Sequence, residues 1–275
     1  MYTLTVMGNS FLVITVILSP QLHTPMYYFL CNLSFIDCCF TSCTVPKMLY
    51  DIISNMRTIS VTGCLVQMTF YLSLGIAECL LLAVMAYDRY IAICSPLYYT
   101  IIMSQRLCGY ITGIMWSGSI IFSVIPAFIR PLVFCRRNRL NHFACEILVV
   151  LELACGDLSA TKLFMFVQSF YVLLLPLIFI VVTYICIINS ILKIHSAQGR
   201  SKAFSTCASH LTVVIMFYGT TLTTYIGQAT FSSKLKYIAL CYSVFTPFLN
   251  PFIYSLRNND VKGAFKKILT KYPVM

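Results

Sequence analysis

Charged side chains are scarce in this chain of 275 residues. Asp, Glu, Lys and Arg make up 10% of the sequence, 8 residues are acidic, and 59% are hydrophobic. A soluble domain carries roughly 25% charged residues. Because a fold of this length cannot hide so much apolar surface from water, the composition argues against a soluble domain. It predicts a protein whose solvent is lipid.

Sequence motifs typical of enzymes and metal sites are also lacking. Among 14 cysteines there is no Cys-x-x-Cys pair, and no phosphate-binding loop or Ser, His and Asp constellation is present. The four histidines, at positions 23, 142, 195 and 210, fall on different segments. The sequence therefore predicts neither an enzyme nor a structural zinc site. The net charge is +11, and the basic residues lie between the apolar runs. This arrangement favours contact with anionic lipid or an acidic partner over nucleic acid.

Seven apolar runs fill most of the chain. A helix needs about 20 residues to span the hydrocarbon of a bilayer, and these runs are too long and unbroken for barrel strands. No internal repeat or soluble domain interrupts them. The sequence thus predicts an all-α membrane protein, a single seven-helix domain over 1–275. The expected helices are residues 2–19, 26–49, 64–91, 109–129, 163–192, 203–227 and 237–256.

The first run, 2–19, is short. As a helix it is about 27 Å long, slightly less than the roughly 30 Å hydrocarbon core. In the sequence as given, no signal peptide or outer arm precedes it, and the one Asn-x-Ser sequon, at Asn32, falls inside the second run. We therefore expect a truncated N-terminus and poor delivery to the cell surface.

The basic tail and the loop at 130–161 orient the bundle. The two sides carry ten and nine Lys and Arg residues, so their number alone does not decide the orientation. The tail is the densest basic block, and the loop holds three cysteines, a residue type that forms disulfides on the outer side. We expect a cytoplasmic C-terminus with a short amphipathic surface helix at 259–270. Its apolar face comprises Val261, Ala264, Phe265, Ile268 and Leu269.

Two carboxylates, Asp37 and Glu78, fall within the membrane runs. Ionisable groups at that depth usually face a bundle interior. Two neighbouring carboxylates cannot both stay ionised without a cation or a proton. One interpretation is a Na⁺ site shared with Asn250. The other is a pair of protonated acids that hydrogen-bond between helices.

Pro251 interrupts the seventh run, between Asn250 and Tyr254. A proline inside a helix removes a backbone hydrogen bond and produces a kink. The kink is interpreted either as a functional hinge or as a static bend.

Six strings of sequence carry a family resemblance. The most specific is MAYDRYIAIC, residues 85–94, in which Asp88 and Arg89 lie at the end of a membrane-length run. The other strings, in chain order, are Gly8-Asn9, LHTPMYYFL at 22–30, Asp37 with VPKML at 45–49, KAFSTCASHL at 202–211 followed by FYG at 217–219, and PFLNPFIYSLRN at 247–258. Together they resemble the olfactory receptors, a family of seven-helix G-protein-coupled receptors, over nearly the whole chain.

The resemblance implies an odorant-gated receptor of the plasma membrane that couples to a stimulatory heterotrimeric G protein and adenylyl cyclase. Asp88 would restrain Arg89, next to Tyr90, in the resting state. The side chains implied to face the G protein or to rearrange on activation are Arg89, Tyr184, Lys202, His210, Tyr218, Asn250, Pro251 and Tyr254.

The resemblance also implies two disulfides, Cys64–Cys145 and Cys135–Cys155. Spacing alone allows three pairings of these four cysteines. The outer-loop string HFACE, at 142–146, departs from the family pattern, in which a second aromatic residue and an Asp are more usual. This departure concerns ligand specificity rather than fold.

The ligand is expected in the outer half of the bundle. The residues expected to bind it are Tyr71, Leu72, Gly75, Ile76, Gln168, Ser169, Val172, Thr221, Leu222, Tyr225, Leu240 and Ser243. None of them is charged, so a small neutral, volatile and mostly apolar odorant with one oxygen function is predicted. The basic stretch at 136–139 provides the alternative, because positive charge folded inward would favour acids.

Two other functions fit the sequence less well. A transporter or channel is disfavoured because no half-repeat and no matching pair of broken helices is visible. A truncated, non-signalling member of the receptor family is supported by the short N-terminus.

Overall fold

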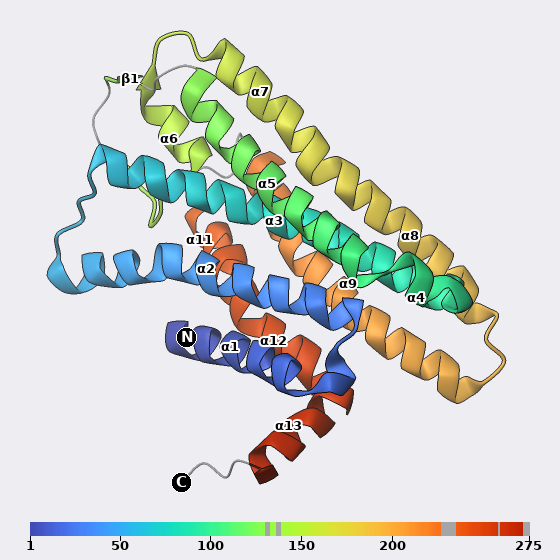
Figure 1. The fold of residues 1–275 in the computed structure, drawn as a ribbon. Helices are drawn as coiled ribbons and strands as arrows, with labels where there is room; N and C mark the ends of the chain where they lie inside the picture. Colours follow the sequence, from blue (N-terminus) through green and yellow to red (C-terminus); the bar gives the residue numbers. More distant parts are fainter. Residues whose placement is uncertain (130–132, 136–138, 227–234, 258, 272–275) are drawn as a thin grey trace.

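Membrane-length helices packed side by side dominate the computed structural model (Figure 1). The structure describes residues 1–129, 133–135, 139–226, 235–257 and 259–271, without the side chains of 126–129, 202, 225, 226, 235, 256, 257, 259 and 269–271. Within these residues six helical segments are long and apolar enough to cross a membrane, and a shorter apolar helix lies beside them. This is the all-helical membrane fold that the composition predicts.

The elements follow the apolar runs in order. They are α1 (Tyr2–Leu18), η1 (Pro20–Leu22), α2 (Pro25–Ser54), α3 (Val61–Cys94), η2 (Pro96–Tyr98), α4 (Tyr99–Ile102), α5 (Gln105–Ile129), β1 (Val133–Phe134), α6 (Ile147–Leu153), β2 (Ala154–Cys155), α7 (Ser159–Ser169), η3 (Phe170–Leu174), α8 (Leu175–Leu192), α9 (Ala197–Ile226), α11 (Leu235–Leu240), η4 (Cys241–Phe245), α12 (Thr246–Arg257) and α13 (Asn259–Lys271).

Several helices extend beyond the apolar runs that predict them. Helix α2 continues past residue 49 to Ser54, and α9 begins at Ala197 rather than near residue 203. Hydropathy marks the part of a helix that lies in hydrocarbon, whereas backbone hydrogen bonding continues into the polar interface. The extra turns therefore carry polar sequence that the apolar pattern does not detect.

Helix α3 is the centre of the bundle. It packs against α2, α5, α8 and α9 (Figure 1). Of the most apolar 18-residue stretch of α3, 67% is buried within the protein, whereas 22% of the most apolar stretch of α5 is buried. Ser60 caps its first turn, where the side-chain oxygen accepts from the Gly63 amide at 3.1 Å. Residues on several faces of α3 therefore contact protein rather than lipid.

Two π-helical turns, η3 and η4, interrupt the fifth and seventh segments. Each lies shortly before a proline, Pro176 in α8 and Pro247 in α12. A proline lacks the amide proton of a regular helix, and π turns inside helices often lie at functional sites. Both turns contribute side chains to the outer cavity described below.

Helix α13 rests against the bundle by one face. Val261 and Ala264 are buried, Lys262, Lys266 and Lys267 are exposed, and the Phe265 ring packs edge-on against the Phe11 ring of α1, at 4.7 Å between centroids. This is an amphipathic surface helix, with its lysines positioned to meet lipid head groups.

The outer loop between α5 and α7 departs from the all-helical pattern. Strands β1 and β2 pair antiparallel, with Val133 opposite Cys155. A disulfide joins Cys135, the residue after β1, to Cys155 of β2. The short helix α6 follows Glu146. Of the basic stretch at 136–139, only Arg139 belongs to the described residues, where it is exposed.

Candidate functional site

The inner end of α3 holds the Asp88–Arg89 pair. The Arg89 Nε lies 3.1 Å from Asp88 Oδ2, and Tyr99 of α4 donates its hydroxyl to Asp88 Oδ1 at 2.7 Å. Burial and the neighbouring Asp88 carboxylate raise the pKa of Tyr99, so the phenol keeps its proton and remains a donor. Sequence reasoning missed Tyr99, because it belongs to a short connecting helix with no motif of its own.

A cavity of about 790 Å³ lies at this inner end. Its lining includes Asp88, Arg89, His210 and Tyr254. Of the other residues expected there, Tyr90 is half-buried and stacks on Tyr87. The side chain of Lys202 lies outside the described residues.

His210 and Tyr184 are more deeply buried than expected for residues that face a partner protein. They are 2% and 4% exposed. The His210 Nε2 lies 3.1 Å from the Leu82 carbonyl, and its Nδ1 lies 2.9 Å from the Tyr184 hydroxyl. A carbonyl can only accept, so Nε2 carries a proton, and in the neutral ring Nδ1 accepts from the Tyr184 hydroxyl. The neutral imidazole therefore ties α9 to α3 and α8.

Tyr218 forms a second link between α9 and α3. Its hydroxyl donates to the Cys79 carbonyl at 3.0 Å, and its ring is 2% exposed. Both Cys79 and Phe217, the neighbour of Tyr218, line the outer cavity. A ligand that moves Phe217 would therefore also act on the neighbouring residue, whose hydrogen bond to Cys79 joins the two helices.

The two membrane carboxylates are fully buried. Asn250 donates its amide to both oxygens of Asp37, at 3.1 and 2.9 Å. The Glu78 oxygens have no hydrogen-bond partner within the described part of the chain. Carboxylate oxygens suit hard cations such as Na⁺, and an unpaired buried carboxylate requires either a cation or a proton. The residues present therefore fit either a bound cation or a proton held on Glu78.

Gly8 and Asn9 of α1 contact the seventh segment at its proline. A side-chain carbon added at Gly8 would lie 3.3 Å from Pro251 Cγ, so the close approach requires a small residue. Asn9 donates its amide to the Pro247 carbonyl at 3.1 Å. Helix α1 thus packs against the kink in α12 and donates a hydrogen bond to it.

An outer cavity of about 60 Å³ lies between α3, α7, η3, α9 and the outer loop. Eight of the twelve residues expected to bind the ligand line it: Tyr71, Leu72, Gly75, Ile76, Gln168, Ser169, Val172 and Thr221. Further lining residues, which sequence reasoning missed, are Phe40, Met68, Cys79, Glu146, Ile147, Met165, Leu173, Phe217 and Tyr242.

The remaining expected ligand residues lie elsewhere. Ser243 is fully buried and donates to the Ala239 carbonyl at 2.7 Å. The π turn η4 widens the helix at this point, and Tyr242 rather than Ser243 or Leu240 faces the cavity. Leu222 packs against the main core. The side chain of Tyr225 lies outside the described residues.

The expectation of a cavity without a carboxylate is wrong. Glu146, from the outer loop, is 3% exposed and lines the cavity. It accepts a hydrogen bond from Tyr242. Burial raises the pKa of Glu146 to about 7, an effect that the Tyr242 hydrogen bond partly offsets. Sequence reasoning noted HFACE as a departure but had no reason to place this side chain inside the bundle.

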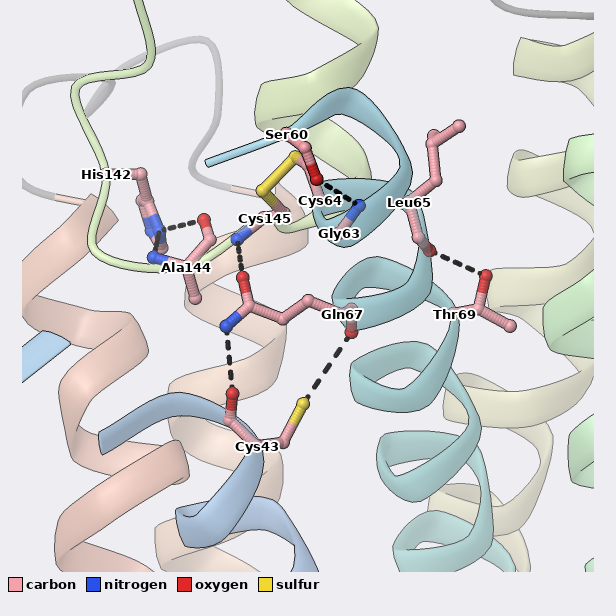
Figure 2. Close-up of a disulfide and its surroundings, with 10 residues drawn as sticks. All are labelled: Cys43, Ser60, Gly63, Cys64, Leu65, Gln67, Thr69, His142, Ala144 and Cys145. Carbon is pink, nitrogen blue, oxygen red and sulfur yellow. Dashed lines mark hydrogen bonds between the residues drawn. A yellow bond between two sulfur atoms is a disulfide. The ribbon is translucent and has the colours of Figure 1, made fainter. Parts of the chain in front are cut away.

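The loop that carries Glu146 is fixed to α3 (Figure 2). A disulfide joins Cys64 to Cys145, the pairing that the family resemblance implies. Gln67 lies between α2 and the loop, where its Nε2 donates to the Cys43 carbonyl at 2.8 Å and its Oε1 accepts from the Cys145 amide at 2.9 Å. The residue before Glu146 is therefore held by one covalent bond and one hydrogen bond.

A helical bundle with an outer cavity, an inner cavity and an Asp–Arg pair at its inner end defines a membrane receptor of the G-protein-coupled class. Residues 1–272 match the sequence family described as olfactory receptor. The chain is 49% identical over 277 residues to olfactory receptor 13C9 of Homo sapiens, covering 98% of this chain and 87% of that protein.

A second relative, olfactory receptor 1M1 of Mus musculus, is 46% identical over 274 residues, covering 98% of this chain and 88% of that protein. The chain belongs to the olfactory receptor family. It is accordingly a multi-pass membrane protein of the plasma membrane and not an enzyme.

Proposed function

We propose that the protein binds a small, mostly apolar odorant in the outer cavity and activates a stimulatory heterotrimeric G protein, which raises cyclic AMP. The observation that carries the proposal is the pair of cavities at opposite ends of the bundle. Tyr218 and His210 bond α9 to α3 in the region between them. A ligand that repacks α9 against α3 thus has a physical route to the inner end.

The dimensions and lining of the outer cavity support a small ligand. On the scale in which one water needs roughly 10–15 Å³, a cavity of about 60 Å³ has room for several non-hydrogen atoms. Its walls are mostly apolar, with a few polar groups that can orient a functional group. Because so few contacts are available, we expect affinities of roughly micromolar or weaker.

The inner cavity supports G-protein coupling. In the proposed resting state Asp88 and Tyr99 hold Arg89 and its surroundings in place. Activation would separate α9 from α3, break the His210 bonds and expose Arg89 to the G protein. Pro251 and Tyr254 would rearrange with the seventh segment. The Tyr254 hydroxyl has no hydrogen-bond partner within the described residues and is therefore available for a new one.

We also propose that Asp37, Glu78 and Asn250 hold a Na⁺ ion. The test is the melting temperature of the purified protein in NaCl against choline chloride. Na⁺ should raise it for the wild-type protein and not for Glu78→Gln, because the amide removes the charge that the ion neutralises. An equal response of both proteins would favour protonated acids that join the helices.

The proposed function is tested in cells with a surface tag and a cyclic-AMP reporter. A panel of volatile organic compounds should produce a dose-dependent rise in cells that display the protein, and no rise in cells that lack the G-protein α subunit. Solute flux independent of the G protein would indicate a transporter. Surface display without any cyclic-AMP response would contradict the proposal.

A further inference from the structure

The outer loop contributes a buried acidic group, Glu146, to the wall of the outer cavity. One oxygen of Glu146 accepts from Tyr242, and the other lies 3.5 Å from the Nε2 of His142. An ionised carboxylate has about four lone-pair positions, and the protonated carboxyl that the raised pKa of Glu146 also populates keeps part of that acceptor capacity. The contact with His142 is too long for a strong hydrogen bond. Glu146 can therefore accept a further hydrogen bond from a molecule in the cavity.

The hydroxyls in the cavity wall also act as acceptors toward a ligand. Ser169 donates its proton to the Met165 carbonyl at 2.8 Å, and Thr221 donates to the Phe217 carbonyl at 2.7 Å. A hydroxyl has one proton and two lone pairs. Since both protons are engaged within their own helices, these residues offer lone pairs to the cavity. The donors in the wall come instead from the Tyr71 hydroxyl and the Gln168 amide.

The position of Glu146 is fixed from two sides. The preceding residue, Cys145, is joined to Cys64 and donates its amide to Gln67 (Figure 2). On the other side Tyr242 belongs to the π turn η4, which presents its hydroxyl to the carboxyl. A polar group held in this way loses little conformational entropy when it binds a ligand.

We propose that Glu146 is the polar recognition group of the outer cavity, that the cavity takes small odorants with a hydrogen-bond donor, alcohols above all, and that Gln67 is a positioning residue for Glu146. The inference deepens the proposed function, because it takes the outer cavity as the odorant site. It narrows the ligand from any neutral oxygen compound to one whose O–H or N–H can be donated.

The test is direct binding, measured on the purified protein in lipid nanodiscs by the thermal shift that an odorant produces. The probes are primary alcohols and their methyl ethers and aldehydes of equal chain length. The wild-type protein should bind the alcohols best. Glu146→Ala should weaken alcohol binding about tenfold or more and leave ether binding within about twofold, because the ether never donated to the carboxyl.

Three further variants keep the test decisive. Glu146→Gln retains the shape and one acceptor oxygen and should weaken alcohol binding by a smaller factor, even if Glu146→Ala folds poorly. Glu152→Gln removes an exposed carboxylate from the same loop and should change nothing. Gln67→Leu should reduce the alcohol-to-ether ratio. If Gln67 had only a structural role, Gln67→Leu would weaken the binding of alcohols and ethers equally.

The outcomes separate this inference from the proposed function. An unchanged alcohol-to-ether ratio in Glu146→Ala and Glu146→Gln, a wild-type preference for ethers or aldehydes, or a lack of alcohol binding would overturn the role of Glu146. Alcohol binding that depends on Glu146 without any cyclic-AMP response would confirm the recognition residue and refute the coupling.

Discussion

Asn9 satisfies a backbone carbonyl that a proline leaves without its helical partner. In a regular helix the amide of residue 251 would donate to the carbonyl of residue 247. Residue 251 is a proline, and the Asn9 side chain donates to the Pro247 carbonyl at 3.1 Å instead. In lipid a free carbonyl is costly because no water replaces the lost bond. The kink in α12 is therefore stabilised by α1.

Asn9→Leu should destabilise the protein by about 1–3 kcal/mol, the cost of leaving a buried polar group unpaired. Leucine has the same number and branching of non-hydrogen side-chain atoms as asparagine, so the change removes mainly the hydrogen bond. The measurement is the melting temperature in nanodiscs with a thiol-reactive dye, which reports the exposure of buried cysteines such as Cys79 and Cys207. Met7→Ala, at a position 62% exposed on the same helix, is the control. Equal melting temperatures for both variants would contradict the proposed role of Asn9.

Arg89→Ala should abolish the cyclic-AMP response. The guanidinium lies in the inner cavity beside Asp88, where we propose that the G protein binds. Arg106→Ala, which removes an exposed basic residue on the same side, should respond as the wild-type protein does. Both are compared at matched surface levels. A normal response from Arg89→Ala would remove this residue from the mechanism.

Tyr99→Phe should raise the cyclic-AMP level in the absence of odorant. Its hydroxyl donates to Asp88 at 2.7 Å, and a hydrogen bond to a charged group contributes roughly 1.5 kcal/mol or more. If that bond exists mainly in the resting state, its loss increases the active population by up to about tenfold. Tyr98→Phe, on the exposed neighbouring residue, is the control. Identical basal levels in the two variants would show that Tyr99 does not restrain the resting state.

The helices and one face of α3 could be predicted from sequence because both depend on local periodicity. Residues 71, 72, 75 and 76 recur at helical spacing, and all four line the outer cavity. The orientation of the seventh segment could not be predicted in this way, because the π turn η4 changes the helical period and turns Tyr242 inward in place of Ser243.

The position of Glu146 depends on contacts between residues far apart in the sequence. Gln67 and Cys145 are 78 residues apart, and Tyr242 and Glu146 are 96 apart. A single sequence read by local pattern contains no signal for such pairs. The same holds for Tyr99, whose contact with Asp88 depends on how the connecting helix α4 folds back.

Loss of the Cys64–Cys145 disulfide should affect ligand recognition as well as stability. A disulfide typically contributes about 2–4 kcal/mol. Cys64→Ser with Cys145→Ser should lower the melting temperature and also weaken the preference for alcohols, since the bond fixes the residue next to Glu146. Peptide mapping of the wild-type protein under non-reducing conditions checks the pairing. Recovery of Cys64 linked to Cys135 would contradict it.

The protonation of Glu146 should make the stability of the protein depend on pH. The groups that face it are Tyr242 and His142, and Lys236 lies nearby, bonded to Asn141. Burial raises the pKa of Glu146 to about 7 in the folded protein, from about 4.3 in an unfolded chain. The folded state therefore holds more protons between these values, so stability falls as pH rises through this window.

The size of this effect is best measured against Glu146→Gln, which cannot titrate. Burial lowers the pKa of His142, so His142 destabilises the protein at low pH. Because Glu146→Gln also removes the carboxylate 3.5 Å from His142 Nε2, the difference between the two proteins reports the Glu146–His142 pair together. Relative to Glu146→Gln, the wild-type protein should lose about 3 kcal/mol of stability between pH 4.5 and 7. Melting curves of both proteins across this range provide the measurement. Parallel curves would show that the Glu146 carboxyl is solvated in the folded protein, which would also remove the basis for its role in ligand recognition.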